Sequence, residues 1–141
     1  MKKYLILLLA VCISAVSLSA QSPDIKELIQ LANQGNASAQ YSLGLMYDKA
    51  RRVPQDILQA MKWYRLSADQ GNALAQFNLG AMYANGEGVR QDYVQAHKWF
   101  TLASDQGNEN GKKYKDIVAT KMTPQQIAQA QELARNWKSK K

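Results

Sequence analysis

NALAQFNLGAMYANGEGVRQDYVQAHKWFTLASDQG, residues 72–107, decides the fold, because residues 36–71, NASAQYSLGLMYDKARRVPQDILQAMKWYRLSADQG, follow the same pattern without a gap. Gly35, Gly71 and Gly107 share one register, and an asparagine follows each of them. A fixed period of about 20–50 residues is typical of a stack of small supersecondary units. Such stacks usually serve as binding scaffolds, so the period bears on function before any single residue does.

Each unit carries two apolar stripes at helical spacing. In the second unit the stripe residues are Leu79, Met82 and Tyr83 in the first helix, and Ala96, Trp99, Phe100 and Ala103 in the second. No long stretch alternates with a period of two, so we expect no strands. Each Gly-Asn pair ends one helix and caps the next, because glycine takes positive φ cheaply and asparagine is a favoured N-cap. The sequence therefore predicts an all-α fold, a superhelical α/α solenoid of helix pairs.

The N-terminal end of the stack departs from the repeat. Ser22 and Pro23 are expected to open a lone capping helix within residues 21–35, with the proline at its first position. The repeats themselves are expected at 36–71 and 72–107.

The C-terminal end, residues 108–141, also departs from the repeat. It keeps the register of another first helix, but lysines replace the apolar pattern. Thr123 and Pro124 then open a final capping helix through a capping box. We expect the tail, residues 138–141, to be frayed.

Residues 1–20 have the layout of a secretory signal peptide: Lys2 and Lys3, then an apolar run, then small residues. The run is too short to span a bilayer comfortably. We expect cleavage after Ala20, export to the periplasm or the medium, and no transmembrane span in the mature chain. Cys12, the only cysteine, would leave with the signal, so no disulfide is expected. A lipoprotein signal ending at Cys12 is the alternative, which the bulky Val11 disfavours.

The net charge of +7 is concentrated near the C-terminus. Residues 112–141 hold 8 basic and 2 acidic side chains, whereas residues 21–111 hold 8 and 9. One interpretation is a solubilising end cap, and the other is a contact with an anionic polymer or surface of the cell envelope. Nucleic acid is disfavoured as a partner, because packing explains the aromatic residues near these lysines and because export argues against it.

Residues suited to catalysis are scarce. His97 is the sole histidine, and Met61 holds the matching position in the first unit. A metal site needs several converging ligands, which the sequence does not supply around His97. Neither a phosphate-binding G-x-x-x-x-G-K-[ST] string nor an S-x-x-K string occurs. We therefore expect no enzyme, no cofactor and no bound metal.

Together, these positions resemble the Sel1-like repeat, a helix pair with A-x-x-x-L-G-x-x-Y, a G-x-G-V loop, an aspartate and A-x-x-W-Y. The second unit matches at Ala75, Leu79, Gly80, Tyr83, Gly86, Gly88, Val89, Asp92, Ala96, Trp99, Phe100 and Gly107. In the first unit Ala50 and Arg52 replace the loop glycines, so that loop could take another course. The resemblance implies a curved, right-handed stack that makes protein–protein contacts.

A solenoid of helix pairs presents its first helices on the concave side. The positions there that face away from the core are the candidate contacts: Tyr41, Leu45, Asp48, Phe77, Ala81, Ala84, Lys113 and Ile117. Their mixed aromatic, aliphatic and charged composition suits an extended or helical peptide. The alternative is that Tyr41 and Phe77 pack between neighbouring units. The hypothesis is a monomeric adaptor of the envelope that holds a partner protein in this groove.

Overall fold

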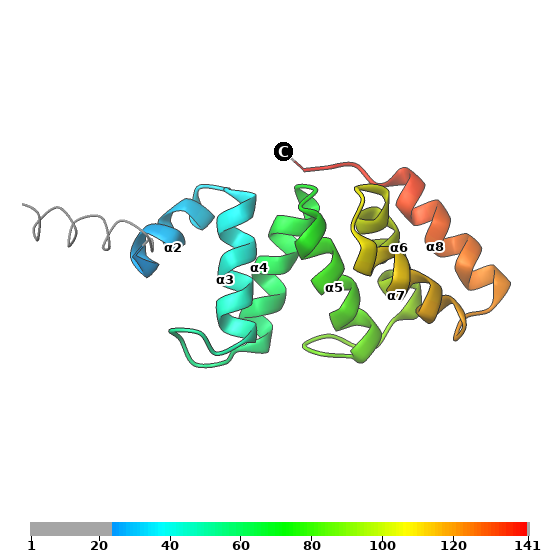
Figure 1. Cartoon of the computed structure of the whole chain (residues 1–141), viewed down its shortest axis with the longest axis horizontal. Coiled ribbons are helices and arrows are strands. Elements are labelled where there is room, and N and C mark those ends of the chain that lie inside the picture. The colour runs from blue at the N-terminus through cyan, green and yellow to red at the C-terminus, as the bar shows by residue number, and fades with distance from the viewer. Residues whose placement is uncertain (1–23, 141) are drawn as a thin grey trace, which may run out of the picture.

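The structure, a computed structural model, describes residues 24–140, which form helices and no strand. The helices are α2 (Ile25–Asn33), α3 (Ala37–Asp48), α4 (Ile57–Asp69), α5 (Ala73–Asn85), α6 (Tyr93–Asp105), α7 (Glu109–Ala119) and α8 (Pro124–Asn136). From α2 to α7, each helix packs against the next, and the result is an elongated stack (Figure 1). The predicted all-α solenoid of helix pairs is confirmed, with α3–α4 and α5–α6 as its two full repeats. The predicted signal segment lies outside the described residues.

The turns between repeats follow from the Gly-Asn pairs. Gly35, Gly71 and Gly107 have φ of 94°, 98° and 90°, where a side chain would be strained. The following asparagine accepts a hydrogen bond from the N–H three residues on, at 2.9, 3.0 and 2.7 Å in the three turns. Each turn thus ends one helix and starts another with almost no connecting chain.

Glycines and aromatic rings pair the two helices of each repeat. A Cβ built on Gly80 would lie 2.8 Å from the Phe100 ring, and one on Gly44 would lie 2.5 Å from the Tyr64 ring. Gly111, in α7, instead meets backbone, because a Cβ there would lie 2.9 Å from Phe100 O and from Ser104 N. These glycines allow the close approach of neighbouring helices.

Buried glutamines join one unit to the next. Gln40 Nε2 donates to Ala32 O at 3.1 Å, and Gln76 Nε2 donates to Ala68 O at 3.2 Å. Both glutamine oxygens accept from another glutamine at 2.8 Å: Gln40 from Gln70, and Gln76 from Gln106. Since both polar atoms of each buried amide are satisfied, the boundary between units has a repeated and specific polar contact.

The loop inside the first repeat keeps the course of its glycine-rich counterpart. Ala50 and Arg52 have φ of 50° and 65°, against 70° and 68° for Gly86 and Gly88. Gln55 Nε2 donates to Asp48 O at 2.9 Å, as Gln91 Nε2 donates to Ala84 O at 2.8 Å. The expectation that this loop takes a different course, because it lacks the glycines, is therefore wrong.

The N-terminal helix starts later than expected. Asp24 is the N-cap of α2, its carboxylate accepting from Lys26 N at 3.5 Å. Ser22 was expected in that role, but Ser22 and Pro23 lie outside the described residues.

At the other end, α8 packs against α6 rather than against α7 (Figure 1). In α7, Lys115 and Asp116 hold the positions of Leu79 and Gly80. Neither residue reproduces the contact of the second repeat, in which Gly80 packs against the Phe100 ring.

The tail is ordered and docked, so the expected fraying is wrong for residues 138–140. Trp137 stacks edge-on against Trp99, with ring centroids 6.4 Å apart. Ser139 Oγ donates to Gln70 O at 2.8 Å, and Lys140 N donates to Asp69 O at 2.7 Å. The chain therefore returns from α8 to the C-terminal end of α4 (Figure 1).

Candidate functional site

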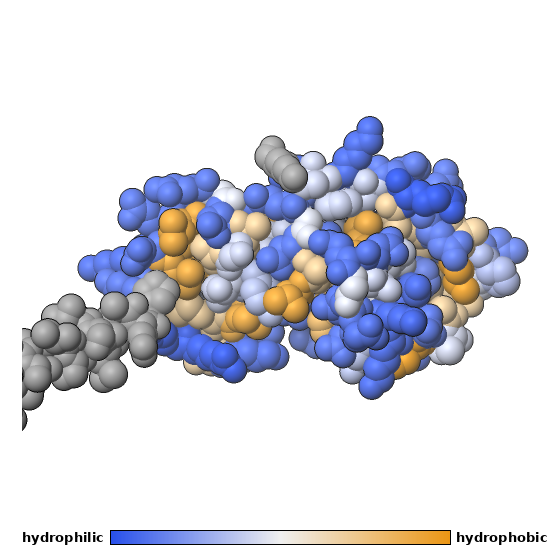
Figure 2. Space-filling model, turned by 45° about the horizontal axis from the view of Figure 1, so that its top comes forward, coloured by the Kyte–Doolittle hydropathy of each residue, from blue (hydrophilic) through white to orange (hydrophobic). Residues whose placement is uncertain are grey.

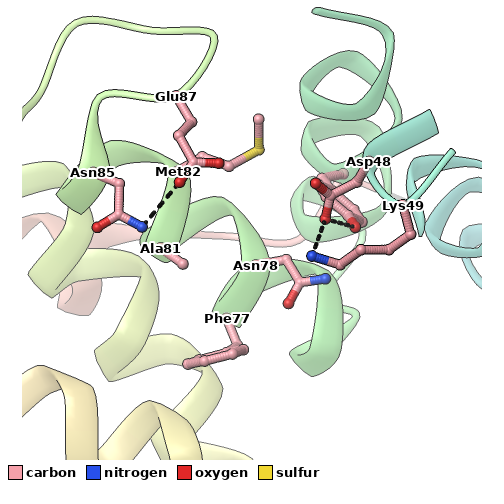
Figure 3. A pocket seen from close by; sticks show the side chains of 9 residues that line it. Asp48, Lys49, Phe77, Asn78, Ala81, Met82, Asn85 and Glu87 are labelled. Carbon is pink, nitrogen blue, oxygen red and sulfur yellow. Dashed lines mark hydrogen bonds and ion pairs between the residues drawn. The ribbon is translucent and has the colours of Figure 1, made fainter. Parts of the chain in front are cut away.

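The side of the molecule formed by α3, α5 and α7 is here called the first-helix face. Between α3 and α5 it has a hollow of about 230 Å³. Its lining residues are Asp48, Lys49, Tyr64, Phe77, Asn78, Ala81, Met82, Asn85 and Glu87. We call it the α3–α5 hollow. Figure 3 shows Asp48 and Lys49 on one side of it and Asn85 and Glu87 on the other.

One wall of the α3–α5 hollow is a hydrogen-bonded group at the end of α3. The Tyr64 hydroxyl donates to Asp48 Oδ2 at 3.1 Å, and Lys49 Nζ lies 3.3 Å from the same oxygen. Burial raises the pKa of Tyr64, and the Asp48 carboxylate raises it further. The phenol therefore stays protonated and remains a donor to Asp48.

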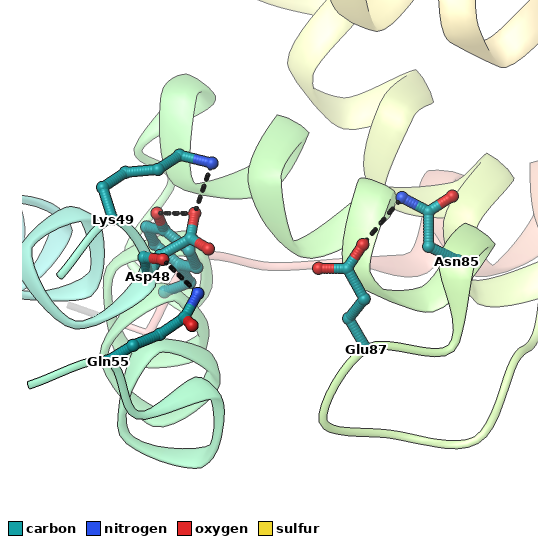
Figure 4. Close-up of polar contacts among 6 residues, drawn as sticks. Asp48, Lys49, Gln55, Asn85 and Glu87 are labelled. Atoms are coloured by element: carbon teal, nitrogen blue, oxygen red, sulfur yellow. Dashed lines mark hydrogen bonds and ion pairs between the residues drawn. The ribbon is translucent and has the colours of Figure 1, made fainter.

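The opposite wall consists of the end of α5 and the loop that follows it. Asn85 Nδ2 donates to Glu87 Oε1 at 3.1 Å, which holds the carboxylate beside the hollow (Figure 4). Asn78 lies two helical turns before Asn85, on the same face of α5. Its amide lowers the pKa of Tyr41 and of Tyr64, against the larger raising effect of burial. The floor between the walls is apolar, with Phe77, Ala81 and Met82. The hollow thus combines an apolar floor with amide and carboxylate groups on its rim.

Asn78, which lines the hollow, has an aromatic counterpart one unit further along. Tyr114, in α7, is the counterpart of Asn78 in α5. Its ring lies 5.6 Å from that of Phe77 and 6.0 Å from that of Phe100. The space that Asn78 leaves open between α3 and α5 is therefore filled by an aromatic ring between α5 and α7.

The structure brings together only part of the predicted contact stripe. Asp48, Phe77 and Ala81 line the α3–α5 hollow. The half-buried residues Tyr41, Leu45 and Ala84 pack against the apolar core. Lys113 and Ile117 are exposed on α7, away from the hollow.

The alternative interpretation of the aromatic residues accounts for part of their environment. Phe77 contacts Phe100 of its own repeat and Tyr114 of the next unit, with ring centroids 5.6 Å apart in both cases. Tyr41 lies 6.0 Å from Tyr64, within one repeat. Phe77 therefore packs between units and also lines the hollow, so the two roles are not exclusive.

Sequence reasoning missed six lining residues: Lys49, Tyr64, Asn78, Met82, Asn85 and Glu87. Asn78 and Asn85 are seven residues apart, so they share a helix face, and this spacing could have suggested them. Glu87 is in a loop, and its direction depends on the turn after α5, which periodicity does not describe.

His97 lies away from the hollow, buried between α6 and α7. Its Nδ1 is 3.3 Å from Thr101 Oγ1, and burial and the nearby Lys115 lower its pKa, while Asp116 opposes the shift. Within residues 24–140 no group of three or more histidine, cysteine, aspartate or glutamate side chains is arranged to hold a metal ion. None of the helices in this range has both the length and the apolar character needed to cross a bilayer.

Polar side chains cover much of the surface. Figure 2 shows that the apolar residues visible on one face form separate patches divided by polar ones. On α7, Lys112 and Lys113 are exposed beside Tyr114 and Ile117, which are 41% and 44% exposed. The basic segment is therefore accessible, although Lys140 is paired with Asp69 at 3.1 Å.

The repeated helix pairs place this protein in the class of α-helical repeat proteins. The Sel1 repeat matches residues 37–72 and 73–108. The chain belongs to the Sel1 repeat family, whose members are generally protein-interaction scaffolds.

Two solved structures are similar to this chain. One is c5321, a protective antigen present in uropathogenic Escherichia coli strains and displaying an SLR fold, at 35% identity and a TM-score of 0.77. That match covers 80% of this chain and 24% of c5321, so the chain corresponds to about a quarter of that protein. The other is a Sel1 repeat protein from Oxalobacter formigenes, at 39% identity and a TM-score of 0.64, covering 65% of this chain and 69% of that one. No curated protein matches the chain.

Proposed function

We propose that this protein is a non-enzymatic adaptor, exported to the cell envelope, that binds a segment of a partner protein across the α3–α5 hollow. The observation that carries the proposal is the local opening of the first-helix face. Asn78 lines this hollow, whereas Tyr114, its counterpart in α7, packs its ring against Phe77. An apolar floor with a few polar groups on its rim is the usual composition of a binding site.

The repeat itself supplies a variant that tests this proposal. Asn78→Tyr places in α5 the residue that the fold already accommodates at the matching position of α7. We expect the variant to fill the hollow and to lose the proteins that the unaltered protein captures from an envelope extract. Tyr114→Asn, which opens the other step, is the matched control and should keep them. Thermal unfolding of both variants checks that the fold is retained, and capture by folded Asn78→Tyr at the original level would contradict the proposal.

Export rests on the sequence of residues 1–20, with its basic start, apolar run and small-residue end. Expression of the full chain in a Gram-negative host, followed by cell fractionation and N-terminal sequencing, tests it. We expect a periplasmic or secreted protein that begins at or near Gln21. Retention of Met1 in a cytosolic product would show that this part of the proposal is wrong.

A second candidate function is contact with an anionic envelope polymer through the basic C-terminal segment. It is supported by the exposed lysines of α7 and by the excess of basic residues after position 111. Binding of that kind weakens as ionic strength rises and should be lost when Lys112, Lys113 and Lys115 are changed to glutamine. Binding in the α3–α5 hollow should survive those three changes.

A further inference from the structure

We propose that the α3–α5 hollow selects a lysine or arginine side chain of the bound segment. This inference rests on the proposed function above and specifies the chemistry of the partner. It is supported by the negative charge of the rim, by the apolar floor of the hollow, and by the roles of the other acidic residues in the chain.

The rim of the hollow has an excess of negative charge. Asp48 reaches it from the end of α3, and Glu87 reaches it from the loop after α5 (Figure 4). Lys49 is the one cationic residue among the lining residues. The lining therefore carries a net negative charge, in a chain whose overall charge is +7.

Of the two rim carboxylates, Glu87 is the one without an ion pair in the part of the chain that the structure describes. The ion pairs among residues 24–140 are Lys49 with Asp48 and Lys140 with Asp69. Glu87 accepts a hydrogen bond from the neutral Asn85 amide only, at 3.1 Å. An incoming cation would thus meet a carboxylate that is oriented but not neutralised, next to a second carboxylate whose partner is the adjacent residue.

Four other acidic residues have structural roles away from the hollow. Asp56 and Asp92 cap α4 and α6, each accepting from the N–H three residues on at 3.0 Å. Asp24 caps α2, and Asp69 binds the tail. None of these four lines the hollow.

The floor suits the aliphatic part of a long basic side chain. Phe77, Ala81 and Met82 provide apolar surface, along which the methylene groups of lysine or arginine can lie while the charged end stays at the rim. The amide oxygens of Asn78 and Asn85 are further acceptors for its N–H groups. An acidic side chain would meet like charge, and an aliphatic one would leave the Glu87 carboxylate without a cation.

This inference can be tested by selecting peptides from a random phage-displayed library on the immobilised protein. We expect the selected peptides to be enriched in lysine and arginine at one position. The enrichment should fall for Asp48→Asn with Glu87→Gln, and rise for Lys49→Gln, which removes the competing ammonium group. Asn78→Tyr should select no common sequence.

The outcomes separate the two proposals. If Asn78→Tyr selects the same peptides as the unaltered protein, the binding site is elsewhere and the proposed function fails. If Asn78→Tyr abolishes selection, but the peptides show no preference for basic residues, only the present inference fails.

A selected peptide then permits a quantitative test by fluorescence anisotropy. Replacing its key lysine or arginine with norleucine keeps the aliphatic length and removes the charge. We expect binding to weaken about tenfold, and Glu87→Gln to weaken binding of the original peptide about three- to tenfold. Glu87→Gln should have little effect on the norleucine peptide. Equal affinity of the two peptides for the unaltered protein would overturn the inference.

Discussion

Ala50 and Arg52 adopt a left-handed backbone conformation that residues with a side chain seldom take. Each such residue costs about 1–2 kcal/mol relative to a right-handed conformation. The loop is nevertheless held in place by hydrogen bonds, with Asp56 N donating to Tyr47 O at 3.0 Å and Gln55 donating to Asp48 O. The first repeat therefore tolerates strain that Gly86 and Gly88 avoid in the second.

Relief of this strain should increase the free energy of unfolding, which can be measured. Ala50→Gly should raise the free energy of unfolding by up to about 1 kcal/mol, because glycine takes positive φ freely and part of the gain is offset by its greater freedom in the unfolded chain. Urea denaturation measures the change. Gly86→Ala, at the matching position of the second repeat, is the control and should be destabilising by a similar amount. A loss of stability in Ala50→Gly would contradict this account of the loop.

Two of the differences between the repeats occur together, at the two ends of one hydrogen bond. Tyr64 donates to Asp48 in the first repeat, and in the second Phe100 and Ala84 replace both partners. Such a paired exchange leaves no buried polar group without a partner. The sequence shows both differences, but their connection depends on the distance between α3 and α4, which is visible only in the structure.

The hollow illustrates the same limit of sequence reasoning. Periodicity predicted the buried stripes correctly, because the apolar positions repeat every 36 residues. The lining of the hollow instead includes positions at which the units differ, such as Asn78, where α7 has Tyr114. Periodicity describes only the positions that repeat, so it does not indicate a site formed where the units differ.

At the scale of elements, α6 and α7 enclose a histidine. His97 is 4% exposed, and its surroundings include Thr101 on its own helix and Lys115 and Asp116 on α7. Burial, together with Lys115, lowers its pKa below the ordinary value of about 6.5. The contact between these two helices therefore favours the neutral imidazole.

This contact predicts a loss of stability in mild acid. Below about pH 6.5 the unfolded chain takes up a proton at His97 more readily than the folded chain does, so the free energy of unfolding falls as pH drops toward the lowered pKa. Above that range the stabilising effect is present in full. His97→Met, which introduces the residue found at position 61, should remove this part of the pH dependence. Urea denaturation at pH 7.5 and pH 5.5 gives the comparison, and an unchanged difference between the two pH values in the variant would contradict the prediction.

The placement of α8 could not be predicted from its sequence, although its cap and its stripe could. Thr123 forms the expected capping box with Gln126, and Pro124 is the first helical residue. An amphipathic stripe shows that a helix packs, but not on which neighbour. The neighbour of α8 is α6, whereas α7 has Lys115 and Asp116 in place of Leu79 and Gly80, a difference that lies in another element.

At the scale of the whole molecule, the tail connects the last helix to the first repeat. Lys140 and Ser139 bind the carbonyl groups of Asp69 and Gln70. The Trp137 ring lies close to Gly71, since a Cβ built on that glycine would be 3.7 Å from the ring. The ion pair of Lys140 contributes little, because its side chain is 77% exposed. The backbone contacts and the tryptophan therefore account for most of the attachment.

Removal of residues 138–141 should lower the free energy of unfolding by about 1–2 kcal/mol, because two hydrogen bonds to the end of α4 are lost. Lys140→Ala, which keeps the backbone contact, should cost less than about 0.5 kcal/mol. Urea denaturation of the two variants distinguishes the contributions. If truncation has no effect, the tail is attached too weakly to link the repeats.

The docking point of the tail has a consequence for the length of the protein. Asp69-Gln70-Gly71, where the tail binds, recurs as Asp105-Gln106-Gly107 at the end of α6. A duplicated copy of residues 72–107 inserted after Gly107 would offer the tail the same three residues one unit further on. The terminal cap could thus travel with the growing end, and gene duplication could lengthen this protein by whole repeats without redesign of its closure.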